Sequence, residues 1–115
     1  MPIRRGDLFW ADLNPVKGSE QAGRRPVVVI QNDVGNEAAP TVIVAPLTTK
    51  SFTKPYPINV HIPQGIAGLK EHSTILLSQI RTIDKTRLDR KIGHLPPTYL
   101  KHVGQAICIS LGLSL

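Results

Sequence analysis

Short stretches of β-branched and other apolar residues, separated by Pro, Gly and Asn, run through most of the chain. This pattern predicts β-strands. We expect strands at Leu8–Leu13, Pro26–Gln31, Thr41–Ala45, Ile58–Ile62 and Ser73–Leu77, shorter ones at Arg81–Ile83 and Lys91–His94, and a helical turn over Lys85–Leu88. The second of these is apolar on both faces and should be buried on both. Short strands with no long helix between them favour an antiparallel barrel or sandwich over a parallel α/β sheet.

The last segment has a helical period instead. Four apolar residues share one helical stripe: Leu100, Val103, Ile107 and Leu111. Pro96 and Pro97 suit the first turn of this helix, where a missing N–H costs nothing. Gly104 inside it costs about 1 kcal/mol relative to alanine, so tertiary packing must stabilise the helix. We therefore predict one mainly-β domain over residues 1–115, a small barrel closed by a C-terminal helix.

The composition is that of an ordinary folded protein, with 41% hydrophobic and 19% charged residues in 115. No apolar run approaches the roughly 20 residues that span a bilayer. The N-terminus has arginines but no apolar stretch after them, unlike a signal peptide. Cys108 is the only cysteine, which excludes an internal disulfide framework and a cysteine-based zinc cluster. These features indicate a cytoplasmic protein with no membrane contact.

The formal charge of +6 favours a polyanionic partner, either a nucleic acid or an acidic protein segment. Two polar loops, residues 14–24 and 46–57, are longer than a hairpin needs, and such loops often carry function. In the second loop, cations and aromatics alternate: Lys50, Phe52, Lys54 and Tyr56. This alternation suits phosphate pairing and base stacking, but it equally suits a loop whose aromatics pack against the barrel.

Arg25 and Thr48 are the candidate chemical groups. Arg25 enters the buried second strand, and Thr48 lies just past the end of the third, so adjacent strands would bring both to one rim. A guanidinium matches phosphate oxygens bidentately and stays charged, and a hydroxyl beside it can bind a further oxygen. On composition alone, Arg25 is explained equally well as a solvated surface charge and Thr48 as a turn residue.

Four motifs, in order along the chain, resemble those of the MazF/PemK family of toxin ribonucleases. They are Arg5–Pro15 with Gly18–Gln21, Arg25–Asp33, Pro46–Thr48 and Ile75–Asp84. The likeness continues through Leu88–His94 into the final helix, so it covers nearly the whole chain. Several motifs in the right order are a far stronger signal than one short pattern.

The resemblance implies an SH3-like barrel that forms a two-fold dimer and cuts single-stranded RNA at short sequences without a metal or cofactor. It implies 2′,3′-cyclic phosphate and 5′-OH products, a block of translation, and neutralisation by an acidic antitoxin. Arg25 and Thr48 match the family's essential residues, and Ser19 and Gln79 match substrate-contacting positions. Arg24 is an alternative to Arg25, although the family's motif sets its arginine beside the proline.

The general base stays open, because an arginine is a poor base. Glu20 is the available loop carboxylate, and an ion pair between Glu20 and Arg24 explains it equally well. The four histidines lie in separate predicted elements: His61, His72, His94 and His102. We interpret His61 and His94 as strand residues and His102 as a helix surface residue. No paired histidine spacing or acidic cluster indicates a metal site.

Three other functions fit the same fold class. The related CcdB-like toxins use this type of barrel to poison DNA gyrase, relying on C-terminal residues that include a tryptophan, whereas the only tryptophan here is Trp10. A non-catalytic RNA-binding module would keep the basic surface without needing both Arg25 and Thr48. A purely structural interaction domain would leave the two long loops unexplained.

Overall fold

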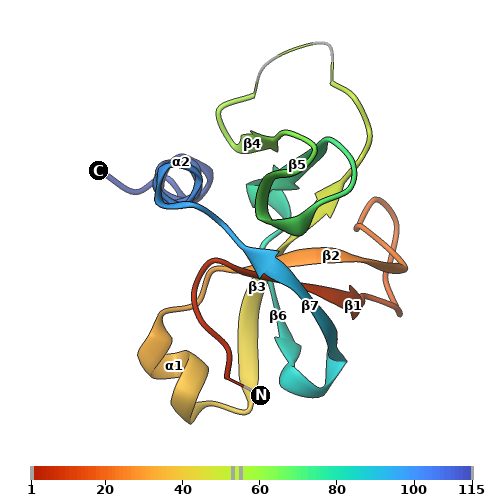
Figure 1. Cartoon of the computed structure of the whole chain (residues 1–115), viewed down its shortest axis with the longest axis vertical. Coiled ribbons are helices and arrows are strands. Elements are labelled where there is room, and N and C mark those ends of the chain that lie inside the picture. The colour runs from red at the N-terminus through yellow and green to blue at the C-terminus, as the bar shows by residue number, and fades with distance from the viewer. Residues whose placement is uncertain (1, 53, 55, 115) are drawn as a thin grey trace.

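Strands form the framework of the computed structural model, which describes residues 2–52, 54 and 56–114. Thr53 and Pro55 of the predicted loop 46–57 lie outside the described residues. The strands are β1 (Asp7–Asp12), β2 (Arg24–Val29), β3 (Thr41–Thr48), β4 (Asn59–Ile62), β5 (Ser73–Leu76), β6 (Arg81–Asp84) and β7 (Leu88–His94). The helices are α1 (Asp33–Ala38) and α2 (Pro97–Leu111), with short 3₁₀ turns at η1 (Ile66–Gly68), η2 (Leu77–Gln79) and η3 (Lys85–Arg87) (Figure 1).

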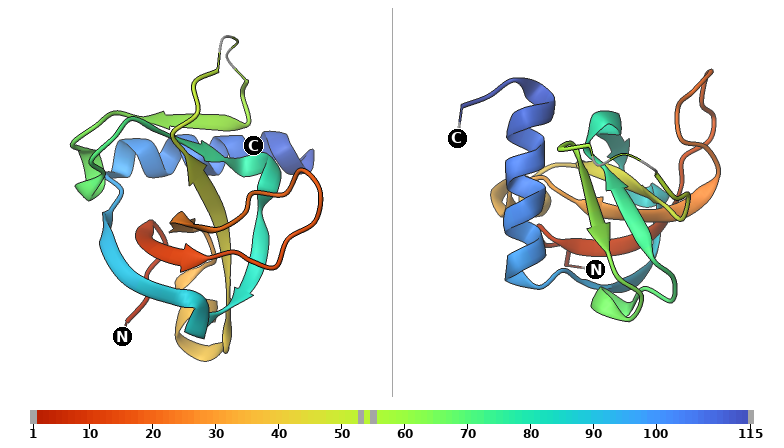
Figure 2. Two further views of the ribbon diagram at one scale, coloured as in Figure 1. Left: turned by 90° about the vertical axis from the view of Figure 1, so that its right-hand side faces the viewer. Right: turned by 90° about the horizontal axis from the view of Figure 1, so that it is seen from above.

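The strands form a strongly bent antiparallel sheet in the order β4-β5-β3-β2-β1-β7, and β6 pairs with β3. The long strand β3 pairs with β6 over Thr41–Val44 and with β5 over Leu47–Thr48. The bend separates a small β3-β5-β4 layer from the larger one, and α2 lies against the small layer (Figures 1 and 2). The predicted mainly-β fold with a C-terminal helix is confirmed, although the sheet is curled and no pairing in the described chain joins β4 to β7.

Two apolar clusters lie on opposite faces of β1, β2 and β3. Val28 and Leu47 belong to the cluster beneath α2 and the small layer, whereas Phe9, Val27 and Val29 belong to the cluster on the other face. Alternate strand residues face opposite ways, so a continuous apolar strand supplies both clusters. The predicted burial of the second strand on both faces is confirmed at Val27, Val28 and Val29.

The predicted ends of two strands were wrong in a way that matters for the site. β2 begins at Arg24, before the predicted Pro26, and β3 runs on to Thr48 instead of stopping at Ala45. Pro46 does not end β3, because it keeps a place in the ladder opposite Val27. Thr48 is therefore the last residue of a strand and not a residue beyond it.

Helix α1 was not predicted. Its N-cap is Asn32, whose side chain accepts a hydrogen bond from the Gly35 N–H, an ordinary helix-start signal. Val34 and Gly35 have low helix propensity, and the helix is only six residues long, so no periodicity is visible. Buried Asn36 stabilises the turn, since its Nδ2 donates to the Gln31 carbonyl at 2.9 Å.

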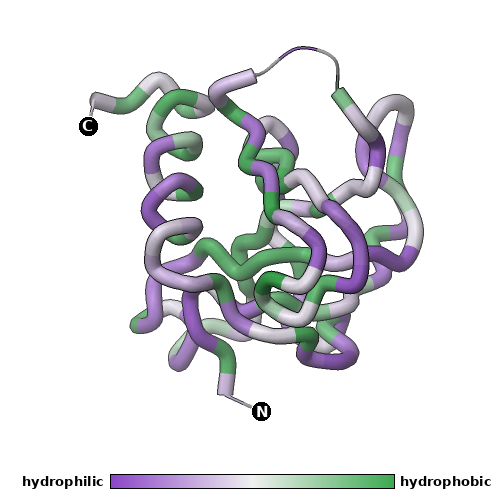
Figure 3. Tube along the Cα trace, turned by 45° about the horizontal axis from the view of Figure 1, so that its top comes forward, coloured by the Kyte–Doolittle hydropathy of each residue, from purple (hydrophilic) through white to green (hydrophobic). Residues whose placement is uncertain are grey.

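Helix α2 has Pro97 in its first turn and ends at Gly112, whose φ of 71° is left-handed. Apolar and polar segments alternate along it (Figure 3). Val103 and Ala106 are buried, but Leu111 is 58% exposed, so the predicted apolar stripe fails at its last residue. No helix in the described residues is long and apolar enough to cross a membrane.

We predict opposite effects on stability for two glycine-to-alanine substitutions. A Cβ at Gly93 would lie 2.1 Å from the Ala67 carbonyl oxygen, so Gly93→Ala must separate two backbones and should destabilise by about 1–3 kcal/mol. A Cβ at Gly104 meets only an Arg5 Nη2 at 3.9 Å, so Gly104→Ala should stabilise by about 1 kcal/mol. Urea unfolding of both variants measures this, and equal stabilities would contradict the close packing of η1 on β7.

Candidate functional site

Arg25 and Thr48 lie together at the rim of the sheet. The register pairs Val27 with Pro46, and continuing it by two residues sets Arg25 directly opposite Thr48. Both residues line one pocket of about 270 Å³. Its other lining residues are Trp10, Arg24, Pro26, Leu47, Thr49 and Ser73. The structure thus brings together the two residues that the sequence singled out, and we call this space the rim pocket.

The Arg25 guanidinium is held by backbone carbonyls. Its Nε donates to the Ala22 oxygen at 2.9 Å and its Nη1 donates to the Leu47 oxygen at 3.1 Å. Both acceptors are neutral, and no carboxylate in the described chain forms a salt bridge with Arg25. The charge is therefore fixed in place but not neutralised, and Nη2 keeps its hydrogens for an anion.

Arg24 is engaged differently. Its Nη2 lies 2.8 Å from Asp89 Oδ2, and its guanidinium carbon lies 4.7 Å from the centre of the Trp10 ring. The alternative expectation of a Glu20–Arg24 ion pair is wrong, because Asp89 on the neighbouring β7 reaches the guanidinium instead. Because Asp89 and the Trp10 ring already contact its guanidinium, Arg24 is a poorer anion-binding group than Arg25.

The Thr48 hydroxyl is oriented by the chain that follows it. Thr48 Oγ1 accepts a hydrogen bond from the Lys50 N–H at 3.2 Å. A hydroxyl that accepts in this way still has its own proton to donate. Thr48 and Arg25 can therefore both donate hydrogen bonds to an anion in the rim pocket.

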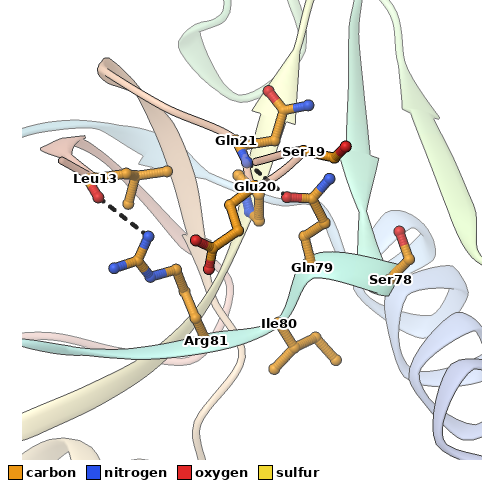
Figure 4. A pocket seen from close by; sticks show the side chains of 9 residues that line it. Leu13, Ser19, Glu20, Gln21, Ser78, Gln79, Ile80 and Arg81 are labelled. Atoms are coloured by element: carbon orange, nitrogen blue, oxygen red, sulfur yellow. Dashed lines mark hydrogen bonds between the residues drawn. The ribbon is translucent and has the colours of Figure 1, made fainter. Parts of the chain in front are cut away.

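A second pocket, of about 420 Å³, lies between the β1–β2 loop and the segment 78–81 (Figure 4). Ser19 and Glu20 enter it from the loop, and Gln79 enters from η2. Gln79 Oε1 accepts from the Gln21 N–H at 2.7 Å and joins the two walls. Arg81 also lines it and donates to the Leu13 carbonyl at 3.1 Å. We missed Arg81 from the sequence, although it lies in the Ile75–Asp84 motif.

A third pocket, of about 330 Å³, continues the second, because Gln21, Ser78 and Gln79 line both. Lys50, Phe52 and Tyr56 line its other side. We call the two together the loop groove. It gathers the remaining predicted substrate contacts, which are Ser19, Glu20, Lys50, Tyr56 and Gln79.

The loop in which cations and aromatics alternate fits each of the two interpretations in part. Phe52 is half-buried with Lys50 Nζ 5.8 Å from its ring centre, while Tyr56 is 49% exposed. Lys54 is exposed and lines neither the rim pocket nor the loop groove. Phe52 is thus partly covered but still lines the loop groove, and Tyr56 is free to contact a ligand.

The rim pocket and the loop groove share no lining residue. They adjoin along β3, because Pro46 lines the groove and the next two residues, Leu47 and Thr48, line the pocket. Glu20 therefore lies with the groove and not with Arg25. Among the described residues, no carboxylate or imidazole lines the rim pocket, so its chemistry is that of a fixed cation and hydroxyls.

The histidines and the two carboxylates with shifted pKa values lie outside the rim pocket and the loop groove. His61 lies on β4, His94 on β7 and His102 on the exposed surface of α2, as predicted. A hydrogen bond from the Arg5 N–H, the largest effect, lowers the pKa of Asp33, and hydrogen bonds from Thr86 lower the pKa of Asp84. Within the described residues, no group of three or more His, Cys, Asp or Glu side chains could hold a metal ion.

Comparisons with known proteins agree on one family. The model of the PemK-like, MazF-like toxin of type II toxin-antitoxin systems matches residues 4–111. An endoribonuclease MazF of Staphylococcus saprophyticus is 52% identical over 111 residues, which are 96% of this chain and 92% of that protein.

Solved structures of such proteins are also similar to this chain. The crystal structure of MazF from Deinococcus radiodurans has a TM-score of 0.84 at 25% identity and covers 98% of this chain and 99% of its own. A mycobacterial endoribonuclease, solved with its cognate antitoxin, has a TM-score of 0.78 over 99% of this chain and 97% of its own. At 22% identity, the second similarity shows the fold alone.

We predict that Gln79→Ala loosens the β1–β2 loop. Losing the acceptor for the Gln21 N–H removes a hydrogen bond worth about 1 kcal/mol, so amide exchange at Gln21 should accelerate roughly fivefold. Hydrogen-exchange NMR measures the rate at that single amide. Gln64→Ala, at an exposed loop position, is the matched control. Unchanged exchange at Gln21 in Gln79→Ala would mean that the loop is held by other contacts.

Proposed function

Because the chain belongs to the PemK-like, MazF-like toxin family of type II toxin–antitoxin systems, and is an endoribonuclease of that family, we propose that it cuts single-stranded RNA at a short sequence without a metal ion. Cutting messenger RNA in this way stops translation, which accounts for toxicity. The single observation that carries the proposal is the un-neutralised Arg25 guanidinium directly opposite Thr48 in the rim pocket.

The cleavage we propose is a transesterification within the RNA. The ribose 2′-OH attacks the adjacent phosphorus, the bond from phosphorus to the 5′ oxygen breaks, and no water is consumed. The products are a 2′,3′-cyclic phosphate and a 5′-OH end. The 2′ proton leaves to solvent or a base, and the departing 5′ oxygen takes a proton up.

Arg25 serves this reaction by stabilising charge. Negative charge grows on the non-bridging phosphate oxygens as the 2′ oxygen attacks, and a cation already fixed beside them needs no reorganisation. The Ala22 and Leu47 carbonyls hold the guanidinium so that Nη2 is available for a phosphate oxygen. The Thr48 hydroxyl, which the Lys50 N–H orients, donates a hydrogen bond to a second phosphate oxygen.

The proton-transfer groups are not among the residues that line the rim pocket. Glu20 lies in the loop groove, which supports a role in contacting the substrate more than a role as the base. We therefore assign the rate enhancement of the rim pocket to electrostatic stabilisation. Ser19, Gln79, Lys50 and Tyr56 contact the nucleotides that flank the cut, along the loop groove.

We further propose that the toxin is a cytoplasmic homodimer, inhibited by a cognate antitoxin with an acidic, flexible segment. The net charge of +6 supports an anionic inhibitor, because an acidic segment competes with RNA for the same cations. A segment that becomes ordered only on binding is also exposed to proteolysis when free, which provides a route to release the toxin.

The first experiment is cleavage of a long single-stranded RNA in EDTA, with the ends mapped. We expect cuts at one short sequence that leave cyclic phosphate and 5′-OH ends. Arg25→Ala should lower kcat by about 10²–10³-fold, because it removes the fixed charge. Thr48→Val, which keeps the shape but loses the hydroxyl, should also lower kcat.

Two further variants test whether the loss is specific to Arg25. Arg4→Ala removes an exposed arginine outside the rim pocket and the loop groove, and we expect it to cleave like the wild type. Arg24→Ala should lower kcat by less than about tenfold, because the Arg24 charge is already paired with Asp89. If the wild type cuts none of several varied RNAs, the nuclease assignment fails and gyrase poisoning becomes the next function to assay.

The homodimer is tested by sedimentation. We expect a single species of twice the 12.6 kDa chain mass at micromolar concentration. The apolar side chains left exposed near the end of α2, Ile109, Leu111 and Leu113, support association. A purely monomeric protein under these conditions would contradict the proposed homodimer.

A further inference from the structure

A row of polar residues crosses the strands beside the rim pocket. Thr74 on β5 is paired with Thr48 on β3 and with His61 on β4. Directly opposite residues of antiparallel strands share a face, so Thr48, Thr74 and His61 follow one another on the same face of the sheet. Thr48 shares the rim pocket with Arg25. His61 lies two strands from Thr48, a separation of about 10 Å between backbones.

The row ends in a pocket of about 340 Å³ that the family motifs do not include. Its lining residues are Thr49, Lys50, Ser51, Phe52, His61, Ile62, Pro63, His72, Ser73 and Thr74. Thr49 and Ser73 also line the rim pocket, so the two spaces adjoin. Three of the lining side chains are basic and none is a carboxylate, which is the composition of an anion site.

Both histidines of this pocket are held through the same ring nitrogen. His61 Nδ1 lies 2.9 Å from the hydroxyl of Thr74, a threonine that is only 4% exposed. His72 Nδ1 accepts from the Gln64 N–H at 3.4 Å. When Nδ1 accepts a hydrogen bond, the proton of a neutral imidazole is on Nε2. The Gln64 N–H thus makes Nε2 the donor of His72, and a Thr74 hydroxyl that donates to Nδ1 does the same for His61.

We propose that this pocket is a second phosphodiester subsite for the RNA strand whose scissile phosphate lies in the rim pocket. His61 and Lys50 bind the oxygens of a neighbouring phosphate, with His72 beside them, and Phe52 offers a ring for the adjoining base. This subsite rests on the proposed function, because it places the strand relative to Arg25 and Thr48. It adjoins the loop groove, with which it shares Lys50 and Phe52, and adds His61 and His72 to the substrate path.

Single-stranded RNA suits this pocket better than an acidic peptide. Thr48 of the rim pocket and His61 lie two β-strands apart, about 10 Å between backbones. Neighbouring nucleotides of one RNA chain bridge such a separation. An aromatic ring beside the donors is the usual partner of a base and adds little for a carboxylate side chain. The test is therefore built on changes in the RNA itself, to which a peptide site would be indifferent.

The experiment uses the RNA sequence found by the mapping above, as a set of short oligonucleotides. Each carries one neutral methylphosphonate in place of one phosphodiester, at every linkage except the scissile one. We measure kcat/KM for the wild type and for the His61→Gln/His72→Gln double variant, which changes only residues outside the loop groove. In the wild type, one linkage near the cut should lower kcat/KM roughly tenfold when neutral, since hydrogen bonds to a charged oxygen are lost.

In the double variant, the same neutral linkage should lower kcat/KM by less than about twofold, because the histidine side chains that bind this linkage have been replaced. His102→Gln, on the exposed surface of α2, should keep the wild-type pattern. Equal sensitivity of the wild type and the double variant at every linkage would overturn the subsite while leaving the nuclease intact. A wild type that cleaves none of the unmodified oligonucleotides would defeat the proposed function, and the subsite with it.

Discussion

The exchange of partners along β3 determines where everything else lies. One edge of β3 pairs with β6 over its first half and with β5 over its last two residues, while β2 pairs along the other edge. A strand that changes neighbours in this way has to leave one layer and enter another, and the sheet bends around it. Because β2 begins where β3 ends, the bend gathers the start of β2, the end of β3 and the small β5-β4 layer at one rim.

Neighbouring arginines show how the fold sets the use of a charge. Arg24 and Arg25 are consecutive in β2, so their side chains leave opposite faces of the strand. One meets Asp89 and Trp10, whereas the other meets two carbonyl oxygens. Carbonyls orient a guanidinium without cancelling its charge, so the same residue type is structural at one position and available to a ligand at the next.

The elements that the sequence predicts well are those with strong local patterns. The β-branched runs and the proline-led final helix are found close to where they were expected. Helix α1 was missed because six residues with a glycine and a valine carry no period. The end of β3 was misplaced because Pro46 looks like a stop, although its partner Val27 keeps it in the ladder. The gathering of His61 and His72 in one pocket depends on the pairing of β4 with β5, which no local pattern encodes.

Two consecutive residues of the β1–β2 loop are tied to different parts of the site. The Gln21 N–H is bound to Gln79 in the loop groove, and the Ala22 carbonyl is bound to the Arg25 guanidinium. The loop is thus a mechanical link between the groove that we propose contacts the nucleotides and the guanidinium that we propose stabilises the phosphate. A strand that fits the groove badly and pushes the loop aside also shifts the guanidinium. Such a linkage turns a mismatch into slower chemistry as well as weaker binding.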